Sequence, residues 1–158
     1  MLITLSVTPL RKLLKQPWLI RFRRMFGLFA FFYVSLHFLI YIWLDKSFDL
    51  REMLADVLKR PFITVGFAAF LLLIPLALTS TTGWIRRLGG KRWQALHRLI
   101  YASAILGVIH YLWLVKADRK KPLEYGFILA LLLGYRVAAW VGSKVADSQM
   151  RSSASLGG

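Results

Sequence analysis

The stretch KRWQALHRLIYASAILGVIHYLWLVK, residues 91–116, decides the fold, and it carries two of the chain's three histidines, His97 and His110, inside one apolar run. Thirteen residues separate the two histidines. On an α-helix this spacing is an axial offset of about 20 Å at ~1.5 Å per residue. The stretch is also long enough to cross a bilayer. It therefore predicts a transmembrane helix with one histidine toward each end.

The composition is that of an integral membrane protein. The chain has 158 residues, 58% of them hydrophobic, which is too apolar for a soluble domain of this length. Its net charge of +15 comes from basic residues between apolar runs, which indicates membrane topology rather than nucleic acid binding. The lack of cysteine excludes disulfides, thiolate metal sites and a cysteine nucleophile. No dinucleotide fingerprint, P-loop or nucleophile–base set is visible, so we expect no catalytic residues.

We predict an all-α membrane protein, in which a bundle of helices holds a cofactor. Residues 1–142 form one transmembrane domain, and the small, polar residues 143–158 form a disordered tail. Residues 1–10 are shorter than the roughly 20 residues that cross a bilayer, so they count as a partial span. Four segments qualify as complete transmembrane helices: residues 25–44, 62–81, 93–115 and 122–140.

Basic residues in the short connections predict the orientation. Residues 11–24 carry six Lys or Arg and residues 86–98 carry five, against four each in residues 45–60 and residues 116–121. By the positive-inside rule, the N-terminal segment and the C-terminal tail lie in the cytoplasm. The connections at residues 45–60 and 116–121 then lie on the outer face.

The connection at residues 45–60 predicts a short amphipathic helix. It has four acidic and four basic residues. Asp49 followed by Glu52 is typical of a helix start, and apolar residues follow at helical spacing. Pro61 then fits the first turn of the next span. We expect the amphipathic helix to lie on the outer membrane surface.

His37 and His110 are predicted to lie at the same depth in the membrane. His37 is eight residues before Asp45 and His110 is six residues before Lys116, each at the outer end of its span. At ~1.5 Å per residue their depths agree within about 3 Å. Two imidazoles at one level can ligate one iron atom, which predicts a six-coordinate b-type haem near the outer face. The alternative is that each histidine only hydrogen-bonds a neighbouring helix.

His97 has no histidine partner at its own depth near the cytoplasmic end. On a straight helix, thirteen residues also leave His97 and His110 roughly 140° apart around the axis. A second haem at His97 would need a ligand from a missing segment, another subunit, a non-histidine group or water. Otherwise His97 orients a cofactor or a propionate. The sequence predicts the outer haem and leaves the inner one open.

Three further residues are candidates for cofactor binding. Gly107 lies three residues before His110 and leaves space for a macrocycle, and Tyr101 could donate a hydrogen bond. Arg92 could pair with a haem propionate or a flavin phosphate at the inner face. Each residue has an ordinary alternative: close helix packing for Gly107, an interfacial anchor for Tyr101 and a positive-inside charge for Arg92.

Several motifs resemble the ferric reductase-like transmembrane domain family. They are KQPWLIRFRRMFGL, VSLHFLIY, RPFITVG, ALTST and LGGKRWQALHRLIYASAILGVIHYLW, which together extend over most of the chain from about Leu10 to Trp113. His37, His97 and His110 match the family's histidines in these motifs. The resemblance implies a multi-pass protein of the bacterial inner membrane with b-type haem, and it associates FMN with the family.

The resemblance also implies the partners. Electrons would come from a cytoplasmic flavin reductase or another donor and pass to MsrP, a periplasmic molybdopterin enzyme that repairs oxidised methionine, in a heterodimer. The chain would then be an electron-transfer subunit rather than the catalytic subunit. Family members have a further span upstream, so we expect this sequence to be shortened at its start. The alternatives are a cytochrome b-type ferric or quinone reductase and a non-redox helical membrane scaffold.

Overall fold

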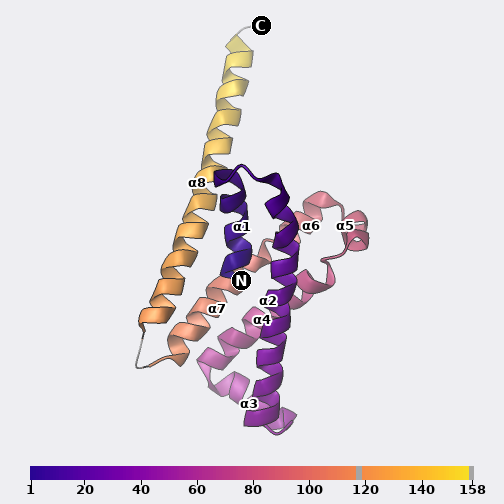
Figure 1. Ribbon diagram of the computed structural model, residues 1–158, viewed down its shortest axis with the longest axis vertical. Coiled ribbons are helices and arrows are strands. Elements are labelled where there is room, and N and C mark those ends of the chain that lie inside the picture. Colours follow the sequence, from indigo (N-terminus) through magenta and orange to yellow (C-terminus); the bar gives the residue numbers. More distant parts are fainter. Residues whose placement is uncertain (117–118, 157–158) are drawn as a thin grey trace.

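The computed structural model describes residues 1–116 and 119–156, and these residues form a helical bundle (Figure 1). Residues 117–118, in the predicted connection 116–121, and residues 157–158 of the predicted tail lie outside the described part. The helices are α1 (Leu2–Leu13), η1 (Pro17–Leu19), α2 (Ile20–Ile40), the π-helical turn η2 (Tyr41–Asp45), α3 (Leu50–Lys59), α4 (Pro61–Leu78), α5 (Thr82–Leu88), α6 (Gly90–Leu96), α7 (Leu99–Leu114) and α8 (Lys120–Leu156).

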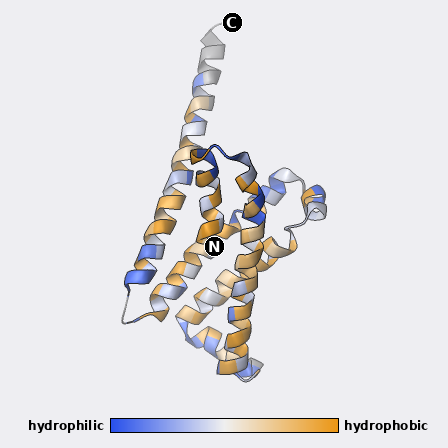
Figure 2. Cartoon of the chain, viewed as in Figure 1, coloured by the Kyte–Doolittle hydropathy of each residue, from blue (hydrophilic) through white to orange (hydrophobic). Residues whose placement is uncertain are grey.

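Four helical segments are long and apolar enough to cross a membrane, which confirms the predicted all-α membrane fold. They are Pro17–Asp45, Pro61–Leu78, Gly90–Leu114 and Lys120–Ala146. Figure 2 shows hydrophobic residues along these helices and hydrophilic residues near their ends. The first of these spans begins before the predicted residue 25. Arginine is a good helix former, and Arg21, Arg23 and Arg24 continue the helix toward its N-terminus.

The predicted amphipathic helix is confirmed as α3. The side chain of Asp49 caps its N-terminus by accepting hydrogen bonds from the backbone N–H groups of Arg51 (2.8 Å) and Glu52 (3.1 Å). Its apolar residues Met53 and Val57 are buried. Pro61 then begins α4. The helix α3 lies across one end of the bundle, which is called the α3 end (Figure 1).

The predicted helix 93–115 is broken between its two histidines. His97 ends α6, and α7 begins at Leu99. Around the break, i to i+3 hydrogen bonds replace α-helical ones, as from the Tyr101 N–H to the Arg98 carbonyl (3.0 Å). The rotation of 140° expected for a straight helix therefore does not apply to this pair.

Where the sequence predicts a disordered tail from residue 143, the described residues continue α8 as one helix to Leu156. Its last turns extend beyond the bundle in Figure 1. Residues 143–156 contain no proline or glycine. Extending an existing helix needs no new nucleation, so small and polar residues can continue it.

The most extensive packing joins α4 to α7, where small residues let the helices approach. Ala69 and Ala104 are buried there, and the hydroxyl of the fully buried Ser103 donates to the Ala69 carbonyl (2.8 Å). The core lies around this pair. It consists of Leu5, Leu73, Leu76, Ile100, Ala104 and Leu129.

Arg136 of α8 ties α1 and α7 to the bundle. Its guanidinium donates to the Tyr101 hydroxyl (2.7 Å) and to the Leu5 carbonyl (2.9 Å). In α1, the Leu5 carbonyl would normally accept from residue 9, but that residue is Pro9, which has no N–H. Arg136 therefore supplies the donor that the proline removes. In a bilayer no water can do so.

We expect Arg136→Met to lower the free energy of unfolding by roughly 1–3 kcal/mol, because it leaves the Leu5 carbonyl unpaired. In a Pro9→Ala background the loss should be smaller, because residue 9 again has an N–H. Thermal unfolding in detergent of the four proteins measures this coupling. Tyr101→Phe is the control for the second hydrogen bond, and equal losses in both backgrounds would contradict the pairing of Arg136 with Pro9.

Candidate functional site

Two cavities open between the helices, and each contains histidine. The larger one, called the His37–His110 cavity, has a volume of about 750 Å³ and lies toward the α3 end, between α2, η2, α3, α4 and α7. The smaller one, called the His97 cavity, has a volume of about 270 Å³ and lies toward the α6 end. Ligand pockets usually measure about 300–1,000 Å³, so the larger cavity falls within this range and the smaller one lies just below it.

His37 of α2 and His110 of α7 face each other across the larger cavity. Their ring centroids are 6.4 Å apart and the ring planes make an angle of 72°. The two histidines that were predicted to lie at one depth thus lie side by side in the structure. A metal between two imidazoles, with bonds of about 2.0 Å and roughly 1.1 Å from each nitrogen to its ring centre, needs centroids about 6.2 Å apart. The pair has the spacing for one metal atom.

The described residues offer no group of three or more His, Cys, Asp or Glu that could hold a metal ion. A protein zinc site takes three or four such ligands. A metal held by His37 and His110 would take its remaining ligands from outside the described residues, and the macrocycle of haem is one group that supplies them. The residues present fit a haem with two axial histidines.

The imidazole of His110 is held in one tautomer. Its Nδ1 lies 2.6 Å from the carbonyl oxygen of Phe62 in α4. A carbonyl can only accept, so Nδ1 carries the hydrogen and Nε2 keeps its lone pair. A backbone carbonyl in this position is a common second partner of a metal-ligating histidine. This contact could not be predicted from the sequence, because it depends on the register of α4 against α7.

A group of charged residues lies at the mouth of the same cavity. Lys46, only 7% exposed, contacts Asp56 (2.6 Å) and Glu52 (2.8 Å), and Arg60 lies 3.5 Å from the other carboxylate oxygen of Asp56. The hydrogen bonds that Lys46 donates to Asp56 and Glu52 raise the pKa of Lys46, and the one it donates to Asp56 lowers the pKa of Asp56. This group of charged residues was not predicted, because its members look like ordinary loop charges in the sequence.

The smaller cavity surrounds His97, whose surroundings differ from those of His110. The Thr79 hydroxyl donates to the Pro75 carbonyl (2.6 Å), so it accepts from Nε2 of His97 (3.1 Å). Trp93 stacks on the imidazole at 3.9 Å between centroids and donates its indole N–H to the Thr79 carbonyl (2.8 Å). The Nε2 of His97 is therefore engaged, whereas that of His110 has no hydrogen-bond partner among the residues that the structure describes.

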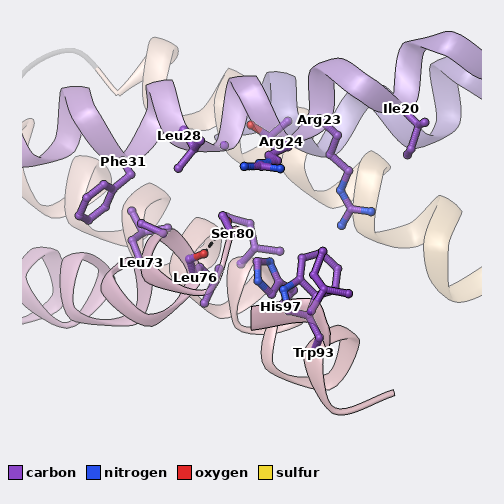
Figure 3. Close-up of a pocket in the computed structure, with 15 residues that line it drawn as sticks. Ile20, Arg23, Arg24, Leu28, Phe31, Leu73, Leu76, Ser80, Trp93 and His97 are labelled. Carbon is purple, nitrogen blue, oxygen red and sulfur yellow. Dashed lines mark hydrogen bonds between the residues drawn. The ribbon is translucent and has the colours of Figure 1, made fainter. Parts of the chain in front are cut away.

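Two arginines of α2 line the smaller cavity. Figure 3 shows Arg23 and Arg24 on the helix opposite His97 and Trp93. Neither guanidinium forms an ion pair within the described residues. The sequence analysis placed these arginines among the cytoplasmic charges and did not name them as site residues.

The three other predicted site residues, Gly107, Tyr101 and Arg92, lie in different parts of the structure. Gly107 lines the His37–His110 cavity, as expected. Tyr101 lines neither cavity, because its hydroxyl is directed to Arg136. Arg92 is exposed on α6 and also lines neither cavity. The structure therefore does not bring Tyr101 and Arg92 to the histidines.

Comparison with known proteins finds one family, described as ferric reductase like transmembrane component, which matches residues 1–108. The chain belongs to the ferric reductase-like transmembrane family. This confirms the resemblance seen in the motifs. The match includes His37 and His97 and ends shortly before His110. No solved structure matches the chain.

Relatives within the ferric reductase-like family carry a more specific name. The chain is 61% identical over 140 residues to the protein-methionine-sulfoxide reductase heme-binding subunit MsrQ of Herminiimonas arsenicoxydans, covering 87% of this chain and 64% of that protein. It is 58% identical over 142 residues to MsrQ of Bordetella pertussis, covering 89% and 68% respectively. For MsrQ of Azospira oryzae, identity is 60% over 136 residues, covering 85% and 58%. The chain thus spans between 58% and 68% of the length of these relatives.

We expect Lys46→Met to lower the unfolding temperature, because it leaves Asp56 and Glu52 without their cation. The pKa of Asp56 is lowered from 3.8 and that of Lys46 raised from 10.5, so both remain charged between these values. The difference from the unsubstituted protein should be constant from pH 5 to pH 9, roughly the inner part of this window. It should shrink only as the pH falls below 3.8 or rises above 10.5.

Lys59→Met is the matched control for this prediction, because Lys59 is an exposed lysine at the end of α3, whereas Lys46 is a buried lysine just before α3. Thermal unfolding in detergent at several pH values compares the two variants. A difference that varies strongly between about pH 5 and pH 9 would show that another titrating group anchors α3.

Proposed function

We propose that this chain is a b-type haem membrane subunit that passes electrons across the bacterial inner membrane to a methionine sulfoxide reductase. The observation that carries the proposal is the pair His37 and His110, with ring centroids 6.4 Å apart across a cavity of about 750 Å³. Relatives at 58–61% identity are named heme-binding subunits of protein-methionine-sulfoxide reductase, which supports the same cofactor and system.

His37 and His110 would be the axial ligands of the haem. Gly107 would leave room for the macrocycle, and the more exposed Arg60, which also lines the cavity, would supply a cation for a propionate. The bound haem would supply a one-electron couple. With both axial positions taken by this chain, no position is open for oxygen or another substrate, so the site suits electron transfer.

The direction of transfer follows from the basic residues. The α6 end, with Arg23, Arg24, Arg86 and Arg87 nearby, is the cytoplasmic face by the positive-inside rule, and the α3 end is periplasmic. Electrons would enter from a cytoplasmic flavin reductase or another donor. They would leave near α3 to the periplasmic catalytic subunit MsrP, with which the chain would form a heterodimer.

The His97 cavity is the place for a second carrier, either another haem or the FMN implied by the resemblance. A second haem would need His97 to release Thr79, and it would need a further axial histidine, which the chain's three histidines do not provide. The phosphate of FMN would need only donors. Arg23, Arg24 and the buried Thr4 hydroxyl, which has no hydrogen-bond partner among the described residues, provide them. We therefore expect one haem per chain.

A ferric chelate or quinone reductase is the second candidate, favoured by the family's description as ferric reductase-like. It would use the same haem and a different acceptor. A non-redox membrane scaffold, in contrast, would hold no haem at all.

Substitution of the histidines tests the haem site. We expect His37→Ala and His110→Ala each to abolish the low-spin haem spectrum of the purified protein, because each removes an axial ligand. His97→Ala is the matched control and should keep both the spectrum and the haem-to-protein ratio. A normal low-spin spectrum in either of the first two variants would show that the pairing is wrong, and a protein without a Soret band from haem-replete cells would exclude the haem function.

The acceptor is tested by stopped-flow reoxidation. Protein reduced with dithionite is mixed with purified MsrP or with a ferric chelate, and the haem spectrum is followed. We expect rapid reoxidation by MsrP and slow reoxidation by the chelate. The opposite order would assign the chain to ferric reduction.

A further inference from the structure

We propose that Gly66 of α4 is a positioning residue for His110: by having no side chain, it lets the imidazole lie against the α4 backbone, where Nδ1 reaches the Phe62 carbonyl and Nε2 is left for a metal. The part of this proposal that concerns a metal rests on the proposed haem function. The part that concerns the imidazole itself does not.

The space at Gly66 is filled by the histidine ring. A Cβ atom built on Gly66 would lie 2.6 Å from Nδ1, 2.8 Å from Cε1 and 3.0 Å from Cγ of His110. Real Cβ atoms do not approach other atoms so closely. Because the ring is rigid, it would have to move as a whole. That movement would lengthen the 2.6 Å hydrogen bond between Nδ1 and Phe62.

The backbone gives no other reason for a glycine here. Gly66 lies inside α4, and it is not among the described residues with positive φ, where glycine is favoured. Glycine is a poor helix former, so the helix itself would favour alanine at this position. The three heavy atoms nearest to its missing side chain all belong to His110. The requirement for glycine therefore comes from the histidine.

The contact also sets the chemistry of Nε2. A histidine that donates from Nδ1 to a carbonyl has a more basic Nε2 and so favours the higher charge of oxidised iron. Displacing the ring in Gly66→Ala removes this hydrogen bond. We expect the haem midpoint potential to rise and the haem affinity to fall by about 10- to 100-fold, the usual effect of losing such a partner.

Two other glycines are matched controls. At Gly134 a Cβ would meet nothing within 4 Å, and at Gly126 its nearest neighbour would be Val108 Cγ1 at 3.5 Å, an ordinary contact. Gly126→Ala and Gly134→Ala should leave the spectrum and the midpoint potential unchanged. Gly107→Ala adds a methyl group to the wall of the same cavity without meeting the imidazole, since its nearest neighbour is Met1 Sδ at 3.9 Å. A change that occurs in Gly66→Ala but not in Gly107→Ala would therefore come from displacement of the imidazole ring and not from a smaller cavity.

A double-mutant cycle on the haem-free protein tests the contact without using the cofactor. Gly66→Ala should lower the unfolding temperature when His110 is present. In a His110→Ala background it should have no such effect, because no ring faces residue 66 and alanine favours the helix. An equal loss in both backgrounds would overturn the proposal, since the crowded neighbour would then not be His110.

Redox titration of the haem-loaded protein tests the second step. A higher midpoint potential in Gly66→Ala, with unchanged values in Gly126→Ala and Gly134→Ala, is the expected result. An unchanged potential in Gly66→Ala would overturn the role in tuning the ligand. If the unsubstituted protein binds no haem, the proposed function fails, and the double-mutant cycle still decides whether Gly66 positions His110.

Discussion

The antiparallel pairing of α4 with the α6–α7 segment is the constraint on which the rest of the structure depends. Four side-chain hydrogen bonds cross this interface within the described residues: from His110 to Phe62, from Ser103 to Ala69, from Trp93 to Thr79, and between His97 and Thr79. In the first three pairs the residue numbers have the same total, as they must along an antiparallel pair of regular helices. Trp93 and His97 are four residues apart, about one helical turn, so both reach Thr79 from the same side of their segment.

This register gives the two histidines of one segment opposite roles. Along α4, a carbonyl faces His110 at one end, and a threonine whose own hydrogen is already donated faces His97 at the other. The first partner leaves Nε2 free, and the second engages it. A polar group inside a membrane is costly unless it is paired, so each histidine is held by α4. Only His110 is held in a way that leaves its usual metal-binding nitrogen available.

Much of this arrangement could be predicted from the sequence, because hydropathy, helix-start residues and distance along a helix are local properties. The spans, the Asp49 cap of α3 and the common depth of His37 and His110 all follow from such counting. What could not be predicted depends on contacts between distant segments. The contact of His97 with Thr79 and the bond from Arg136 to the carbonyl freed by Pro9 are of this kind. Tyr101 was expected at a cofactor for the same reason, since its partner Arg136 lies 35 residues away.

The rule that a polar group inside a bilayer must be paired by the protein also explains where polar residues lie in this bundle. Within a bilayer a carbonyl without its helical partner must be paired by the protein, and Arg136 does this for Leu5. A histidine must also find a partner, and Phe62 and Thr79 serve. His37 is different, because the ring of His110 is the one polar ring that faces it within the described residues, and no hydrogen bond to a neighbouring helix engages it. In a membrane such a group needs a reason to be retained, and a metal shared with His110 would supply it. The three histidines therefore differ in their hydrogen bonding, and this difference points to the cavity between His37 and His110 as the functional centre.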